Sequence, residues 1–162
     1  VKTKEIGIGK ITTISGRYYA MDRYNRWDRI EKAYKAIVFG KGEFFSDPIE
    51  AMQKSYEQNI TDEFIIPKVI LENGKPAAKV EENDSIIFFN FRADRAREIT
   101  RAFIYRDFDK FPTKKFFNLK YVGFSEYDIE FNSIVEVAFR LEPPKNILGE
   151  VVSNHHLKQL RL

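Results

Sequence analysis

Two segments of the chain carry apolar residues at the spacing of an amphipathic helix. The first covers residues 25–39, and Gly40 is placed to end it. Its apolar positions are Trp27, Ile30, Ala33, Tyr34, Ile37 and Val38. The second covers residues 47–58 and opens with Asp47 as N-cap, Pro48 at the first helical position and a glutamate at the third. Both patterns predict helices that pack one face on a core.

Runs rich in Ile, Val and Phe between turn residues predict strands. They cover residues 6–15, 64–72, 76–80, 85–91, 119–124 and 134–139. An Asn-Gly pair at 73–74 predicts a hairpin turn. The apolar run over 85–91 predicts a central, buried strand. Further helices are expected to open at Asp94 and Leu148, with irregular chain over 108–117.

This mixture over 162 residues predicts one domain of the α/β class, with a mixed sheet and flanking helices. The lack of cysteine excludes disulfides, thiolate metal sites and thiol nucleophiles. No apolar run reaches the roughly 18 residues of a membrane span. The first residues lack the apolar stretch of a signal peptide, so we expect a cytoplasmic location and no membrane partner.

Positive charge is concentrated in two blocks. Residues 1–46 hold ten Lys and Arg against five Asp and Glu, and residues 92–120 hold nine against four. The segments 47–91 and 121–162 are acidic. If the fold brings the two basic blocks together, they form a cleft that attracts anionic ligands.

A nucleic-acid surface is the alternative use of this charge. Lysines over 110–120 alternate with Phe111, Phe116 and Phe117, and cations beside aromatic rings suit single strands. The net charge is only +3, without a run of like charges. We therefore expect no nucleic-acid partner.

The first basic block contains the densest group of candidate ligand-binding side chains. Residues 16–29, GRYYAMDRYNRWDR, hold four arginines, three tyrosines and the only tryptophan. They follow a predicted strand and open a predicted helix, and such a turn is a common ligand site in α/β sheets. Guanidinium groups there suit carboxylate or phosphate. Arg17 and Arg23 lie across the turn, and pairing of Arg17 with Asp22 is the structural alternative.

Arg92 and Arg95 form a second pair, three residues apart at a predicted helix start. This spacing puts both guanidinium groups on one face of the helix. Local sequence does not decide between an anion site and pairing with Asp94 and Glu98. If the strands over 10–15 and 85–91 run the same way in one sheet, both arginine pairs would meet at one edge.

Other catalytic constellations are missing from the sequence. His155 and His156 are adjacent, so they cannot form a helical metal pair at i and i+4. Ser15 and Ser125 lack a nucleophile-elbow context, and there is no Walker-type glycine loop. We expect no catalytic residue and no metal ligand in this chain.

Three motifs resemble the 2,3-bisphosphoglycerate-independent, or cofactor-independent, phosphoglycerate mutases. They are GRYYAMDR with NRWDR over residues 16–29, FNFRADRAR over 89–97, and a closing stretch from GEVV at 149–152 to QLR at 159–161. They occur in the family's order along nearly all 162 residues. The family's enzyme is much longer, so the resemblance implies an incomplete phosphotransferase domain.

The resemblance also implies roles for the arginines. The positions that would bind the phosphate and carboxylate of 2- or 3-phosphoglycerate are Arg17, Arg23, Arg92 and Arg95. Arg26 and Arg29 are interpreted as surface or salt-bridge residues. Tyr24 stands where the family usually has an acidic residue, and Ala93 stands where it usually has proline. Neither departure removes a ligand-binding group.

The rest of the enzyme is expected outside this chain. The resemblance places a nucleophilic serine and two metal ions, usually Mn²⁺, in a separate phosphatase-like domain. This chain alone should therefore be inactive; a stand-alone anion-binding module is the alternative. Missing neighbouring strands would leave a hydrophobic sheet edge unpaired, so we expect self-association.

Overall fold

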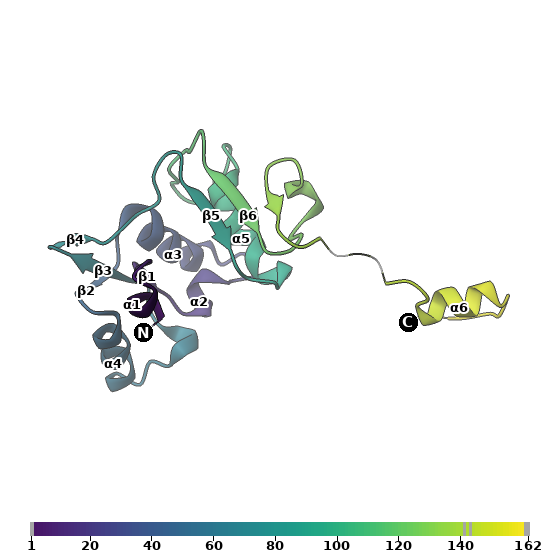
Figure 1. Cartoon of the computed structure of the whole chain (residues 1–162), viewed down its shortest axis with the longest axis horizontal. Coiled ribbons are helices and arrows are strands. Elements are labelled where there is room, and N and C mark those ends of the chain that lie inside the picture. The colour runs from purple at the N-terminus through teal and green to yellow at the C-terminus, as the bar shows by residue number, and fades with distance from the viewer. Residues whose placement is uncertain (1, 141, 143, 161–162) are drawn as a thin grey trace.

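The structure is a computed structural model that describes residues 2–140, 142 and 144–160. The first sheet contains β1 (Thr13–Ile14), β2 (Glu43–Phe45), β3 (Lys68–Glu72) and β4 (Lys75–Pro76), and the second contains β5 (Ser85–Phe88), β6 (Lys120–Gly123) and β7 (Glu136–Val137). The α-helices are α1 (Lys2–Ile6), α2 (Arg17–Ala20), α3 (Trp27–Phe39), α4 (Pro48–Glu57), α5 (Ala93–Ile104) and α6 (Leu148–Asn154). Short 3₁₀ helices cover Asp62–Phe64 and Ile129–Phe131. This arrangement confirms the predicted α/β class (Figure 1).

The first sheet is mixed and is built around β3. Strand β3 pairs antiparallel with β1 and with β4, and parallel with β2. The Asn-Gly pair at 73–74 makes the hairpin turn to β4, as predicted, with both residues at positive φ. The predicted strand over 64–72 is shorter than expected, because residues 62–64 form a 3₁₀ turn instead.

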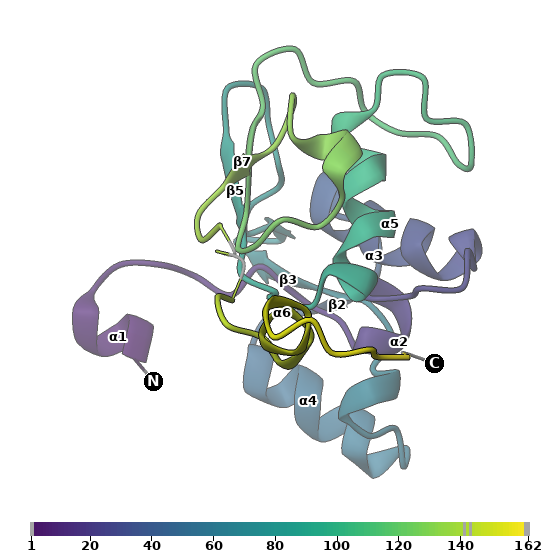
Figure 2. The same ribbon diagram turned by 90° about the vertical axis from the view of Figure 1, so that its right-hand side faces the viewer.

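The second sheet is parallel, in the order β5-β6-β7. Helix α5 follows β5 and lies against one face of this sheet (Figure 2). The prediction of a central, buried strand over 85–91 was wrong, because β5 is an edge strand that alternates between half-buried and exposed positions. Ile87 is 70% exposed and Phe89 is 77% exposed. The face of the sheet away from α5 is therefore open.

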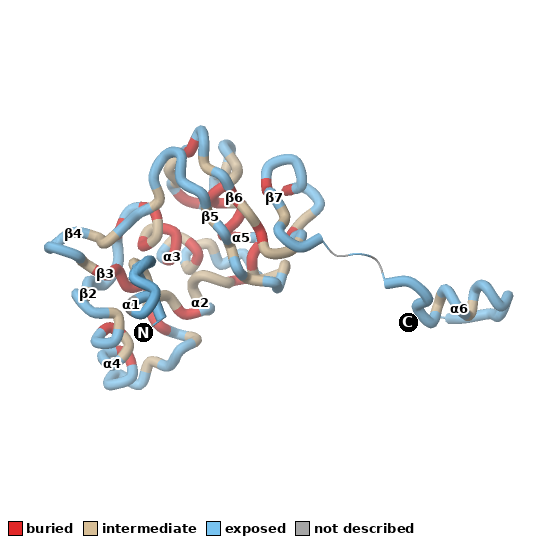
Figure 3. Tube along the Cα trace, viewed as in Figure 1, coloured by how far each residue is buried: buried red, intermediate tan, exposed pale blue. Residues whose placement is uncertain are grey.

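Helices α3 and α5 carry most of the core, and buried positions gather around them and β6 (Figure 3). Tyr34 of α3 is fully buried, with its ring centroid 4.9 Å from that of Phe103 on α5 and 5.5 Å from that of Phe111. Phe111 belongs to the segment 108–117, which is irregular as predicted but packs on this core. Helix α3 also contacts β3 and so connects the two sheets.

The ends of the two predicted helices follow from local chemistry. Gly40 adopts a left-handed conformation at the end of α3, with φ 62° and ψ 36°. A Cβ atom there would lie 2.6 Å from Cγ of Pro76. Both the left-handed backbone and the lack of space therefore favour glycine at this position. Asp47 caps α4 by accepting a hydrogen bond from the Glu50 amide at 3.1 Å. Both helices therefore match their predicted ranges closely.

The prediction of a buried strand over 6–15 was largely wrong. Only residues 13–14 are extended and paired, and residues 2–6 form α1. Gly7 and Gly9 have φ values of 78° and 93°, which interrupts extended backbone. Strands β1 and β5 also belong to different sheets, so the expected common edge does not exist.

Helix α6 lies apart from the rest of the chain (Figure 1). Its predicted start at Leu148 is confirmed, but it ends at Asn154 rather than near residue 157. None of its described residues is buried. Among the described residues, no helix is long and apolar enough to cross a membrane.

Candidate functional site

The first arginine motif begins where the chain lies directly against a neighbouring segment. The Gly16 amide donates to the Ile65 carbonyl at 2.8 Å, and a Cβ atom on residue 16 would lie 2.2 Å from the Glu63 carbonyl oxygen. Only glycine permits this approach. It places Arg17 at the start of α2, where its Nη2 pairs with Glu63 Oε2 at 2.7 Å. Arg17 does not pair with Asp22, the alternative partner, because its guanidinium group pairs with Glu63 instead.

Arg23 and Arg92 meet on one carboxylate, that of Asp94. Nη1 of Arg23 lies 2.8 Å from Oδ2, and Nη2 of Arg92 lies 3.1 Å from the same oxygen. Nε of Arg92 also donates to Oδ1 at 3.3 Å. The hydrogen bonds from Arg23 and then from Arg92 lower the pKa of Asp94 to about 2. The two motifs thus converge, despite lying after strands of different sheets.

Arg95 lies one helical turn further into α5 and points back toward the first motif. Its Nη1 donates to the Met21 carbonyl at 3.0 Å. Its Nε is buried and has no hydrogen-bond partner among the described residues. Arg95 therefore fixes the start of the loop over residues 21–26, which we call the arginine loop.

Aromatic side chains flank these arginines. Tyr24 accepts a hydrogen bond on its hydroxyl from Nη2 of Arg23 at 3.0 Å. The guanidinium carbons of Arg23 and Arg26 lie 5.1 and 5.6 Å from the Tyr24 ring centroid, within cation–π range. Tyr24, which stands where the family usually has an acidic residue, thus supplies an oxygen to Arg23.

Two buried carboxyl groups hold the backbone of the arginine loop. Oδ2 of Asp22 accepts from the Tyr24 amide at 2.8 Å and from the Arg26 amide at 2.9 Å. Oε1 of Glu98, on α5, accepts from the Asn25 amide at 2.8 Å. Sequence reasoning gave neither residue this role. A local signal existed only for Asp22, since an aspartate often caps the amides that follow it in a turn.

Arg29 is packed, whereas Arg26 is exposed. The guanidinium carbon of Arg29 lies 3.5 Å from the Tyr18 ring centroid, and its Nη1 lies 3.7 Å from Oδ1 of Asp22. Only 17% of the Arg29 side chain is exposed. Arg29 is a salt-bridge residue, as interpreted from the sequence, and it also contributes to packing.

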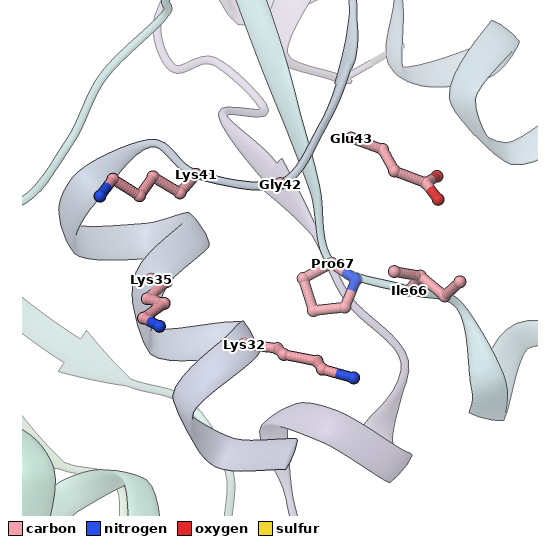
Figure 4. A pocket seen from close by; sticks show the side chains of 7 residues that line it. All are labelled: Lys32, Lys35, Lys41, Gly42, Glu43, Ile66 and Pro67. Atoms are coloured by element: carbon pink, nitrogen blue, oxygen red, sulfur yellow. The ribbon is translucent and has the colours of Figure 1, made fainter. Parts of the chain in front are cut away.

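The lysines beside α3 do not form an anion site. Lys32, Lys35 and Lys41 border a hollow of about 240 Å³ over Pro67. Their ammonium groups point in different directions (Figure 4), and Lys35 is paired with Glu31 at 2.8 Å. The hollow lacks converging cations, in contrast to the meeting of Arg23 and Arg92.

The remaining candidate chemistry is limited. Within residues 2–140, 142 and 144–160, no group of three or more His, Cys, Asp or Glu side chains could hold a metal ion. His155 and His156 are both exposed at the end of α6. Phe111 and Phe116 are buried, which leaves Phe117 as the exposed ring of the proposed stacking surface. This burial weakens the nucleic-acid alternative, because stacking needs open aromatic faces.

Comparisons with known proteins identify relatives over nearly the whole chain. A family described as BPG-independent PGAM N-terminus matches residues 1–129. The 2,3-bisphosphoglycerate-independent phosphoglycerate mutase of Clostridium novyi (strain NT) is 54% identical over 158 residues, which cover 98% of this chain and 30% of the relative. That of Clostridium botulinum (strain Langeland / NCTC 10281 / Type F) is 54% identical over 159 residues, covering 98% and 31%.

A solved structure gives the same result at the level of the fold. The phosphoglycerate mutase of Leishmania mexicana, in crystals at low cobalt concentration, superimposes with a TM-score of 0.80 at 27% identity. The match covers 96% of this chain and 29% of that chain. This chain thus spans about 30% of the length of the relatives it matches. The resemblance carried by the arginine motifs is confirmed, and the chain belongs to the N-terminal family of the BPG-independent phosphoglycerate mutases.

Proposed function

We propose that residues 1–162 form part of the phosphotransferase domain of an enzyme that interconverts 3-phosphoglycerate and 2-phosphoglycerate. In this proposal, the chain supplies the arginine clamp for the substrate's phosphate and carboxylate. The observation that carries it is the meeting of Arg23 and Arg92 on the Asp94 carboxylate, with Arg95 tied to the same loop. A glycolytic role would also imply a cytoplasmic location.

The Asp94 carboxylate supports the proposal that the clamp binds anions. It is an anion held by guanidinium groups from two motifs, and a phosphate or carboxylate of the substrate offers the same oxygen acceptors. These contacts are exposed, so exchange for a ligand anion requires little desolvation. On binding, Arg23 and Arg92 would turn from Asp94 toward the substrate.

Arg17 needs a larger change to join the clamp. In the structure its guanidinium pairs with Glu63, whereas the other three arginines meet near Asp94 and Met21. The Arg17–Glu63 pair is exposed, and such pairs contribute about 0–1 kcal/mol. A dianionic phosphate can therefore displace Glu63 at small cost. We propose that Arg17 is recruited when the substrate binds.

Chemistry beyond binding is assigned to polypeptide outside this chain. We propose that the nucleophilic serine and two Mn²⁺ ions belong to a phosphatase-like domain that acts as the partner of this one. The described residues offer no ligand group for such ions. This chain's own contribution is to hold the glycerate's charged groups while the phosphate is transferred.

We further propose that the chain binds a second copy of itself. Parallel sheets are normally covered on both faces, yet the outer face of β5 and β6 is open. The rings of Phe89, Phe124 and Phe139 form a chain across it, with centroid separations of 4.9 and 4.8 Å. Two copies of the chain could cover these surfaces in each other.

Titration of the 162-residue chain with 3-phosphoglycerate, followed by NMR, tests the clamp. Each hydrogen bond to a charged group contributes about 1.5–3 kcal/mol. We therefore expect Arg92→Ala to weaken binding by about 10- to 100-fold. Arg106→Ala, which removes the same charge from an exposed position beside Phe117, is the matched control. Equal affinity in the two variants would exclude the clamp.

A further inference from the structure

The arginine loop rests on a pair of buried acids. Asp22 is 3% exposed and Glu98 is 4% exposed, and together they accept hydrogen bonds from the consecutive amides of residues 24–26. The two carboxyl groups are close enough for each to shift the pKa of the other. Two buried carboxylates that hold neighbouring amides of one loop would repel each other strongly, so one proton is expected to be shared between them.

The hydrogen bonds favour Glu98 as the member that carries the proton. Asp22 accepts from two backbone amides, and Arg29 lies 3.7 Å from its other oxygen. Glu98 accepts one amide hydrogen bond on Oε1, while its buried Oε2 has no partner among the conventional donors of the described residues. A proton on Glu98 turns this oxygen into a donor toward Asp22.

The electrostatic environment favours the same assignment. Burial raises the pKa of Glu98, the Asn25 amide and Arg101 oppose this rise, and the charge of Asp22 adds to it. Burial alone would raise the pKa of Asp22 too. However, the Arg26 and Tyr24 amides, the Glu98 carboxyl and the Arg29 charge lower it overall. The two pKa values are thus driven apart, as in other carboxyl pairs that hold one proton.

We propose that Asp22 and Glu98 share one proton and that this pair is a positioning device for the arginine loop, and so for Arg23. The pair joins the loop to α5, the helix that carries Arg92 and Arg95. Loss of the proton sets two carboxylates against each other and loosens the amides of Tyr24, Asn25 and Arg26. The importance of the pair for substrate binding rests on the proposed clamp.

The directions of the two pKa shifts determine the pH range in which the Asp22–Glu98 pair holds the arginine loop. Glu98 has a raised pKa, so its contribution is complete below its ordinary value and is lost as pH rises through the folded value. Asp22 has a lowered pKa, so its contribution is complete above its ordinary value and is lost as pH falls through the folded value. The loop is held best between these limits.

Carboxyl ¹³C NMR of the 162-residue chain provides the direct test. In wild type the Glu98 carboxyl should titrate above an ordinary glutamate. In Asp22→Asn the neighbouring charge is gone and an amide N–H₂ can donate to Glu98, so its titration should move down by about one pH unit or more. Identical Glu98 titrations in the two proteins would overturn the proposal.

Hydrogen exchange at the Asn25 amide reports the positioning role. Glu98→Gln keeps the acceptor oxygen and is neutral at every pH, so its Asn25 amide should stay protected when that of wild type loses protection at high pH. Glu142→Gln, at an exposed residue, is the charge-matched control and should behave as wild type. Loss of Asn25 protection at the same pH in wild type and Glu98→Gln would also overturn the proposal.

Binding of 3-phosphoglycerate separates this inference from the proposed function. At each pH, the affinity of wild type is divided by that of Glu98→Gln. Titration of the substrate affects both proteins equally, so it does not change this ratio. The ratio should fall above the Glu98 pKa by at most tenfold per pH unit. If Arg92→Ala binds as tightly as wild type, the clamp is wrong, whereas the NMR results still decide the shared proton. A ratio that stays constant while Arg92→Ala weakens binding would overturn the positioning of Arg23 by the pair.

Discussion

Arg95 donates a hydrogen bond from Nη1 to the backbone carbonyl of Met21 at 3.0 Å. The contact joins residues 74 positions apart in sequence and belongs to both arginine motifs. A side chain proposed to bind substrate therefore also has a structural task, because it fixes the loop on which Arg23 lies. Substitutions of Arg95 will show both effects together.

We expect Arg95→Met to lower the free energy of unfolding by about 1.5–3 kcal/mol. Methionine keeps the apolar stem but leaves the Met21 carbonyl without its charged donor. Urea denaturation of the chain measures this change. Arg106→Met, at an exposed arginine, should alter stability by less than about 0.5 kcal/mol. A similar small effect of Arg95→Met would show that the Met21 contact is weak.

The contacts around Asp94 should weaken in acid. Its pKa is lowered from 3.8 to about 2, so its stabilising effect is complete above about pH 4 and is lost as pH falls toward 2. Asp94→Asn should remove this part of the pH dependence. Midpoints of urea denaturation, determined between pH 5 and pH 2, measure this pH dependence. Asp107→Asn, at an exposed residue, is the control. Parallel curves for wild type and Asp94→Asn would contradict the assignment.

Arg29 and Arg26 should differ in their contribution to stability. Arg29→Ala removes a guanidinium stacked over Tyr18 and close to Asp22, whereas Arg26→Ala removes an exposed group over Tyr24. A desolvated cation–π contact contributes up to about 2 kcal/mol, compared with about 0.5–1 at an exposed site. Thermal denaturation should therefore show the larger loss for Arg29→Ala. Equal losses would mean that the Tyr18 contact adds nothing.

The open face of the second sheet should cause self-association. Phe89→Ser removes a ring that is 77% exposed on that face, whereas Phe117→Ser removes an exposed ring that lies beside Arg106 instead. Analytical ultracentrifugation should show oligomers for wild type and Phe117→Ser, and a shift toward monomer for Phe89→Ser. A monomeric wild type at high concentration would refute this expectation.

The chain alone should not interconvert 3- and 2-phosphoglycerate, with or without Mn²⁺. The described residues contain no metal-holding group, and the chain spans about 30% of its relatives. A coupled assay for 2-phosphoglycerate, run on protein purified from a host that lacks its own mutase, measures this. Turnover above the buffer blank would place catalytic groups within the 162 residues.

Local signals predicted the helices well and the strands less well. The apolar spacing, Gly40 and the Asp47 cap lie within α3 and α4 or next to them, so the sequence contains the information that sets their bounds. The strand over 85–91 was recognised as apolar. Its place at an edge depends on which strands pair with it, and β6 comes more than thirty residues later.

The candidate site, too, could be predicted from the sequence only in part. The motifs identified Arg23, Arg92 and Arg95, but their meeting at Asp94 and Met21 depends on contacts across more than seventy residues. Arg17 was assigned to the same group, and its contact with Glu63 could not be read from local pattern. The Asp22–Glu98 pair escaped notice because acidic residues in a loop and on a helix are ordinary until both prove buried.

The position of Asp94 would determine which anions the proposed clamp selects. Any ligand must displace a carboxylate that is tethered to the site and therefore present at high effective concentration. Exchanging it for chloride or acetate replaces one monovalent anion by another and gains little. A dianionic phosphate interacts more strongly with both guanidinium groups. In the proposed clamp, the tethered carboxylate would thus act as a threshold. A free singly charged anion would gain too little to displace it, whereas a dianionic phosphate would displace it, and the carboxylate of the same substrate molecule would then bind at high effective concentration.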